Sequence, residues 1–181
     1  MYLFIVGWCL MECGPIASGL SFNGYDKETG EAKHDRVQSA IIWKLETSYR
    51  IKDFLTNWNI SVHEWLKNYI YLRMLPNSKS GKTGPSASAT GMTFLVSALW
   101  HGFYPGYFSF FLSAAAVDYL AKVAAPILYP LFKGWCPWPV QYAMLWVWCY
   151  ANCAYFSTAF VHLPFYKHHK VYASMYYIGH F

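Results

Sequence analysis

Residues 139–163 read PVQYAMLWVWCYANCAYFSTAFVHL and carry no formal charge anywhere in the stretch. A helix needs about 20 mainly apolar residues to cross the hydrocarbon core of a bilayer. Lipid offers the backbone no hydrogen-bond partner, so an apolar run of this length crosses only as a helix. The stretch therefore predicts a membrane-spanning helix and an all-α class of membrane protein.

The composition of the whole chain agrees with this class. Of 181 residues, 56% are hydrophobic, 21% are aromatic and only 13% are charged, whereas an average soluble domain has about 25% charged residues. Aromatic side chains are enriched where membrane proteins meet the bilayer interface. The net charge of +5 favours membrane lipids or another anionic partner. The basic residues form no stripe, so we expect no nucleic-acid partner.

A second candidate membrane helix covers residues 106–121 and is interrupted by Asp118. An acid inside such a segment is either a functional proton-relay group or half of a pair. Lys122 follows one helical turn later, and we favour the paired interpretation. Pro126 and Pro130 are expected to end the helical region, because proline removes a backbone donor.

Both ends of the chain are apolar and stop abruptly. Residues 1–11 are too short to span a membrane and are interpreted as the end of a helix whose beginning is missing. Residues 171–181 are apolar again after a polar flank. We expect residues 1–181 to be part of one membrane domain that is incomplete at both ends.

The segments between the apolar runs differ in character. Residues 21–36 are polar with turn signals, and 76–91 are rich in serine, glycine and lysine, so we expect a loop and a flexible insert. Residues 37–55 mix apolar and charged side chains, which predicts an interfacial or cavity-lining helix. The overall prediction is a polytopic all-α fold with re-entrant or interfacial helices around a cavity.

Two polar residues stand out as candidates for chemistry. His101 ends the short apolar run 92–100 and precedes Gly102, which is a natural helix stop. A titratable group in an apolar segment is a functional candidate, although histidine at a helix end is often only a cap. Asn59 precedes a helix expected to begin at Ser61 with a capping box; an asparagine there also has a simple capping role.

Several kinds of site are not indicated by the sequence. The histidines near the C-terminal end lack the regular spacing of a zinc site, and we expect no metal. The chain has no glycine-rich phosphate loop and no nucleophile elbow. Spacing alone therefore leaves the reaction open.

Two motifs carry a resemblance to a known family. WNISVHEWLKNYIYLR (58–73), followed by SALWHGFYPGY (97–107), resembles the paired signature of the membrane-bound O-acyltransferase family. GLSFNGYD (19–26) and the stretch 36–52 are also similar to its lysophospholipid acyltransferase branch, particularly the fungal members. The resemblance implies that His101 and Asn59 are the catalytic pair, because the family uses a histidine and an asparagine at these motif positions.

The resemblance also implies a reaction and a location. The expected reaction moves a fatty acyl chain from acyl-CoA to the free hydroxyl of a lysophospholipid, without a cofactor. Histidine suits the role of the base that activates a hydroxyl. We expect a multi-pass membrane protein of the endoplasmic reticulum that acts in phospholipid remodelling.

Other side chains are candidates for binding the substrates. Basic residues could meet the phosphates of acyl-CoA or of the lipid, although each one singly also suits the membrane interface. Two tryptophans flank the proposed catalytic residues. The candidates are Lys52, Lys67, Arg73, Trp58 and Trp100.

Two alternative functions remain open from the sequence. The first keeps the family but changes the acceptor to a sterol, a diacylglycerol or a protein. The second is a non-enzymatic membrane transporter fragment in which His101 and Asp118 relay protons.

Overall fold

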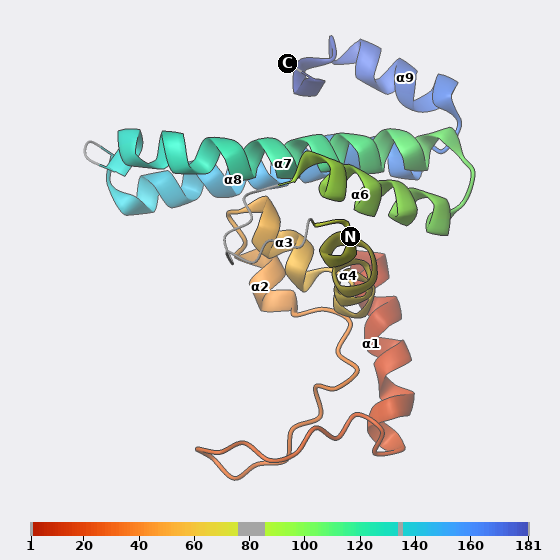
Figure 1. The fold of residues 1–181 in the computed structure, drawn as a ribbon, viewed down its shortest axis with the longest axis vertical. Helices are drawn as coiled ribbons and strands as arrows, with labels where there is room; N and C mark the ends of the chain where they lie inside the picture. The colour runs from red at the N-terminus through yellow and green to blue at the C-terminus, as the bar shows by residue number, and fades with distance from the viewer. Residues whose placement is uncertain (1, 76–85, 134–135, 181) are drawn as a thin grey trace. The chain divides into compact units, whose positions relative to one another are not determined.

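The computed structural model describes residues 2–75, 86–133 and 136–180. These residues form helices joined by turns and loops, and no strand occurs among them (Figure 1). The all-α class predicted from the sequence is confirmed. Residues 76–85 of the predicted insert lie outside the described residues.

The chain divides into two compact units, each described here by itself. The first contains Met1–Ser48 and Lys52–Trp65, and the second contains Tyr49–Ile51 and Leu66–Phe181. Asn59 therefore belongs to the first unit and His101 to the second.

The first unit replaces the single helix expected over residues 37–55 with two short ones. Helix α2 covers Ile42–Glu46 and α3 covers Ile51–Asn57. The hydroxyl of Thr47 donates to the Trp43 carbonyl at 2.8 Å, and that of Ser48 donates to the Lys44 carbonyl at 2.6 Å. Such local bonds compete with helix continuation. The prediction of one continuous helix was wrong for this reason.

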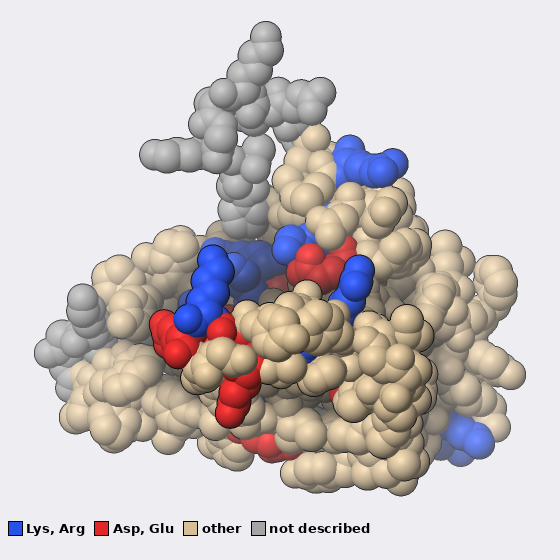
Figure 2. Space-filling view, turned by 90° about the horizontal axis from the view of Figure 1, so that it is seen from below, with Lys and Arg blue, Asp and Glu red and all other residues tan. Residues whose placement is uncertain are grey.

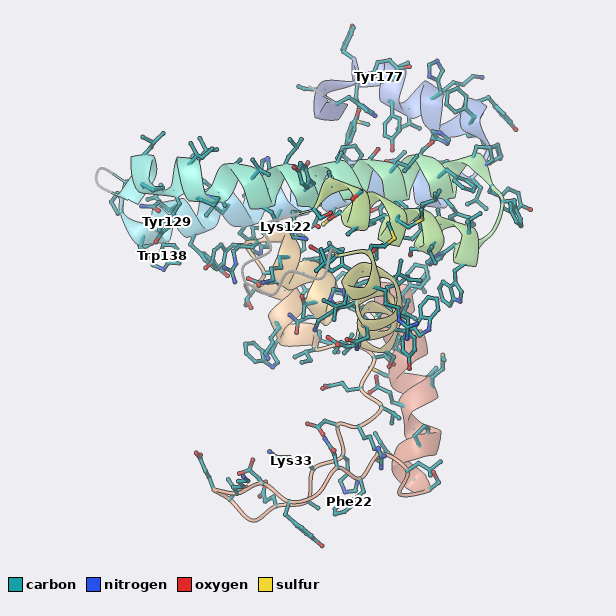
Figure 3. All side chains as sticks on the ribbon, viewed as in Figure 1. Phe22, Lys33, Lys122, Tyr129, Trp138 and Tyr177 are labelled. Carbon is teal, nitrogen blue, oxygen red and sulfur yellow. The ribbon has the colours of Figure 1, made fainter. Side chains whose placement is uncertain are left out.

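The polar loop predicted at residues 21–36 is confirmed. It is closed by an isolated antiparallel bridge between Tyr25 and Ala32. Next to the bridge, the Lys33 ammonium lies 2.8 Å from an Asp26 carboxylate oxygen (Figure 3). This hydrogen bond, aided by the backbone of Thr29, holds the pKa of Asp26 well below its ordinary value.

Three helical segments follow one another without a loop after Asn59. Helix α4 covers Ile60–Leu66, a π-helical turn η1 covers Lys67–Tyr71, and α5 covers Leu72–Met74. Single π-turns inside helices are uncommon and occur frequently at functional sites. Helix α1, at the start of the chain, covers Tyr2–Ala17.

The second unit is built on a pair of long helices. Helix α7 (Pro105–Lys133) and helix α8 (Trp138–Val161) lie side by side, and α6 (Ala87–His101) lies against α7 (Figure 1). Helix α9 (Phe165–Ser174) packs on both α7 and α8, and a final 3-10 turn η2 covers Ile178–His180.

Helix α6 begins earlier than the sequence suggested. The insert was expected to continue to Gly91, but the helix starts at Ala87. The hydroxyl of Ser86 accepts a hydrogen bond from the Ala89 backbone N–H at 3.3 Å. This is a serine N-cap, and the described end of the predicted insert is therefore helical.

Helix α7 also departs from the expectation, because it continues through Pro126 and Pro130. Proline removes one backbone donor, which apolar helices tolerate where neighbouring groups compensate. Within α7, the Lys122 ammonium lies 2.5 Å from a carboxylate oxygen of buried Asp118 (Figure 3). The paired interpretation of Asp118 is confirmed.

One described helix is long and apolar enough to cross a membrane, judged by length and composition. It is the segment Pro105–Leu131 of α7. Helix α8 confirms the predicted helix over 139–163. That this helix spans a membrane stays a prediction. Most of the surface seen in Figure 2 is uncharged.

The contact between α7 and α8 depends on a glycine in the motif that follows His101. The Gly106 N–H donates to the Leu163 carbonyl at 2.8 Å. A Cβ atom at Gly106 would lie 2.8 Å from the Leu163 Cα and still closer to the Ala159 carbonyl oxygen. Both obstacles are backbone atoms, so no side-chain rotation relieves the clash.

We therefore expect Gly106→Ala to destabilise the protein by about 1–3 kcal/mol or more, the range typical of overpacking. Gly91→Ala is the matched control, because Gly91 lies inside helix α6 and a Cβ added there would have no described atom within 4 Å. That change should be neutral or stabilising by about 0.5–1 kcal/mol. The measurement is thermal unfolding of both variants of the full-length protein in detergent. Equal melting temperatures would contradict the proposed packing.

Candidate active site

His101 is the last residue of α6, and the helix ends there because of Gly102. Gly102 has a φ of 127° and donates its backbone N–H to the Ala98 and Leu99 carbonyls at 3.2 Å. A residue with a side chain rarely adopts this φ, so glycine suits the position. The predicted helix stop is confirmed. Helix α6 has 15 residues, fewer than the roughly 20 that a span needs.

The hydrogen bond of the His101 ring fixes its tautomer. Its Nδ1 atom lies 2.8 Å from the Ser97 backbone carbonyl, one turn earlier in α6. A carbonyl oxygen only accepts, so Nδ1 carries the hydrogen in the neutral ring. The Nε2 atom then has the free lone pair, which is what a general base requires.

Aromatic rings surround the His101 imidazole within the second unit. The nearest are Trp100 on the same helix and Phe111 on α7, with centroids 4.6 and 4.7 Å from the imidazole. Phe160 on α8 lies at 5.4 Å and Tyr107 on α7 at 5.6 Å. Three helices thus hold the ring in an apolar environment.

This environment changes the titration of His101. Burial lowers its pKa below the ordinary value of 6.5, and the hydrogen bond to the Ser97 carbonyl partly opposes this. A lowered pKa means that the ring stays neutral as the pH falls further than for an ordinary histidine.

Asn59 occupies the turn between α3 and α4 with an unusual backbone. Its φ is 47°, in the left-handed region, where asparagine is several-fold enriched among residues with a side chain. Its carbonyl accepts from the His63 N–H at 2.9 Å, so α4 begins directly after it. Ser61 lies inside the first turn, and the predicted capping box that starts at Ser61 was wrong.

Trp58, next to Asn59, lies in an aromatic cluster of the first unit. Its ring is 4.7 Å from Trp8 and 6.0 Å from Phe4, both on α1, and it stacks on Phe54 at 5.9 Å. This packing explains a large apolar side chain beside Asn59. Its role in binding substrate stays a prediction.

The other candidate binding residues are exposed. Lys52 lies on α3 in the first unit, whereas Lys67, Arg73 and Trp100 belong to the second. The Arg73 guanidinium lies 5.1 Å from the centre of the Tyr69 ring. Their roles in phosphate or lipid binding, like the approach of Asn59 to His101, stay predictions.

Apart from Trp100, the rings that surround His101 were not predicted from the sequence. Tyr107 belongs to the same quoted motif as His101, so its closeness to His101 had a signal in the sequence. Phe111 and Phe160 had none, because their contacts depend on how α7 and α8 pack. The hydrogen bond between His101 and the Ser97 carbonyl was predictable, because residues four apart are neighbours on a helix.

Comparisons with known proteins agree with the motifs. A model of the membrane-bound O-acyltransferase family matches residues 1–161. The chain is 36% identical over 141 residues to "Lysophospholipid acyltransferase" of Saccharomyces cerevisiae, covering 72% of this chain and 22% of the relative. It is 37% identical over 119 residues to "Membrane-bound glycerophospholipid O-acyltransferase 1" of Mus musculus, covering 66% of this chain and 22% of the relative.

A third relative aligns over nearly the whole chain. It is "Membrane-bound glycerophospholipid O-acyltransferase 2" of Mus musculus, 32% identical over 182 residues, with 98% of this chain and 32% of the relative covered. The chain thus spans between a fifth and a third of the length of these curated relatives.

Proposed function

Because the chain belongs to the membrane-bound O-acyltransferase family, we propose that the whole protein transfers a fatty acyl chain from acyl-CoA to the free hydroxyl of a lysophospholipid. The observation that carries the proposal is the His101 ring, whose Nδ1–H is held by Ser97 and whose Nε2 is available as a base. The name of the yeast relative supports the lysophospholipid as acceptor.

In the proposed mechanism, Nε2 of His101 takes the proton from the acceptor hydroxyl as its oxygen attacks the thioester carbonyl. The carbon–sulfur bond then breaks, and the proton is passed to the leaving thiolate of coenzyme A. The products are a phospholipid and free coenzyme A, and no covalent enzyme intermediate or cofactor is needed. General-base assistance of this kind contributes typically 10²–10⁴-fold.

Asn59 is proposed as the second catalytic residue. Its amide either donates to the developing oxyanion, a contribution of about 3 kcal/mol in comparable enzymes, or holds the acceptor. The exposed Lys52, Lys67 and Arg73 are proposed to meet the phosphates of acyl-CoA or of the lipid. The proposed setting is a multi-pass protein of the endoplasmic reticulum membrane.

The acceptor class is tested with a panel of substrates. The full-length protein in membranes receives labelled acyl-CoA with lysophosphatidylcholine, lysophosphatidylethanolamine, a sterol or a diacylglycerol. We expect labelled phospholipid with at least one lysophospholipid and little product otherwise. Transfer only to a sterol or a diacylglycerol would replace the proposed acceptor. Absence of transfer to any acceptor would contradict the proposed reaction.

The environment of His101 predicts the pH dependence of the reaction. Burial lowers the pKa of His101, so the base form persists as the pH falls below the ordinary histidine value of about 6.5. We expect kcat/KM to fall on the acid side with a midpoint below that value, because this parameter reports the free enzyme. A midpoint above 6.5 would contradict the described burial of the ring.

A further inference from the structure

The most buried histidine of the described residues lies outside the segment that matches the family. His168 is on α9, beyond residue 161, and only 2% of it is exposed. Its Nδ1 is 3.1 Å from the His162 carbonyl, and its Nε2 is 3.3 Å from the Ser109 hydroxyl. The carbonyl only accepts, so Nδ1 donates to His162 and Nε2 accepts from Ser109.

These two hydrogen bonds join three parts of the second unit. Ser109 is in the second turn of α7, His162 directly follows α8, and His168 itself is on α9. A further bond runs from the Tyr172 hydroxyl on α9 to the Phe156 carbonyl on α8 at 3.3 Å. Helix α9 is therefore tied to both long helices by polar contacts in a poorly hydrated place, where unpaired groups are costly.

The tied segments are the ones that carry the rings around His101. Ser109 lies between Tyr107 and Phe111 on α7, and Phe160 precedes His162 by two residues at the end of α8. All three rings contact the His101 imidazole, at 4.7 to 5.6 Å between centroids. A change in the spacing of α7 and α8 at this end therefore moves the rings that orient the imidazole.

We propose that His168 is a positioning residue for His101, which acts by holding the start of α7 and the end of α8 together through Ser109 and the His162 carbonyl. This inference rests on the proposed function of His101. His168 does not touch the reacting atoms. It sets the spacing of the aromatic rings that orient the His101 imidazole and partly shield it from water. Small misplacements of a catalytic group cost up to about 10²-fold in rate.

The test uses the full-length protein in membranes, with His101→Ala to report on the proposed function and four variants to report on the inference. His168→Leu removes both hydrogen bonds, and His168→Gln keeps one donor and one acceptor on a side chain of similar reach. Ser109→Ala removes one hydroxyl from a half-buried site. His169→Leu is the matched control, because His169 is the neighbouring residue on α9 and is exposed. Each variant is measured for kcat, KM for acyl-CoA and the pH dependence of kcat/KM.

We expect His168→Leu to lower kcat by roughly 10-fold to 10²-fold with unchanged KM. The pH at which kcat/KM of this variant falls to half on the acid side should rise toward the pKa of an ordinary histidine, because water reaches the His101 ring. His168→Gln should recover most of kcat, Ser109→Ala should shift both quantities in the same direction as His168→Leu, and His169→Leu should match wild type.

The outcomes separate this inference from the proposed function. If wild type transfers acyl groups through His101 but His168→Leu keeps wild-type kcat and acid midpoint, the positioning role is overturned and the proposed function stands. A loss of activity with an unmoved midpoint indicates a merely structural residue and also overturns it. If His168→Leu does not fold, Ser109→Ala decides by the same two measurements. If wild type and His101→Ala do not differ, the proposed function itself fails.

Discussion

His101→Ala in the full-length protein is expected to lower acyl transfer by about 10²–10⁴-fold, the usual contribution of a general base. The reason is that the hydrogen bond from Nδ1 to the Ser97 carbonyl leaves the lone pair of Nε2 available to accept a proton. The measurement is consumption of labelled acyl-CoA with a lysophospholipid, at matched expression in membranes. Normal turnover by this variant would refute the mechanism.

Two further variants make the result specific. The alanine change also leaves a space among aromatic rings, which lowers stability by itself. His101→Gln fills much of this space and keeps hydrogen-bonding groups, but it has no basic nitrogen, so we expect it to be as inactive as His101→Ala. His169→Ala removes an exposed histidine and should leave turnover unchanged.

Replacement of Asn59 is expected to lower kcat by roughly 10²–10³-fold if its amide donates to the oxyanion. The left-handed backbone of Asn59, with a φ of 47°, provides a sharp test. Asn59→Gly removes the amide but adopts this φ without strain, whereas Asn59→Ala removes the amide and adds strain. We expect both variants to be inactive, and only the alanine variant to lose stability.

The glycine variant is the informative one. If Asn59→Gly turns over normally and melts like wild type, the residue serves only the turn between α3 and α4, and it has no part in catalysis. Thermal unfolding and kcat are measured on the same preparation, so that loss of folded protein is not mistaken for loss of chemistry.

Local signals in the sequence predicted much of the helical structure. The uncharged stretch 139–163 became α8, with bounds Trp138–Val161, because a long apolar run has few other ways to satisfy its backbone. Gly102 ended α6 where expected. Each of these features depends on residues that are neighbours along the chain.

Features that depend on competition or on packing were not predictable. The hydroxyls of Thr47 and Ser48 ended α2 where a mixed apolar pattern suggested continuation. Proline usually ends helices, but α7 continued through Pro126 and Pro130. For the site, the motifs indicated His101 and Asn59, whereas Phe160 contacts His101 across 58 intervening positions and gives no sign of it in the sequence.

The π-helical turn η1 (Lys67–Tyr71) has a consequence for insertions and deletions. A π-turn holds one residue more than an α-helical turn of the same rise. Deleting one residue from it would therefore leave about one full turn of regular α-helix before α5, and the side chains of α5 would keep nearly the same direction. In a regular α-helix such as α6, each residue turns the chain by about 100°, and a one-residue deletion would rotate every following side chain by that angle. A deletion within η1 should therefore be tolerated better than one within α6.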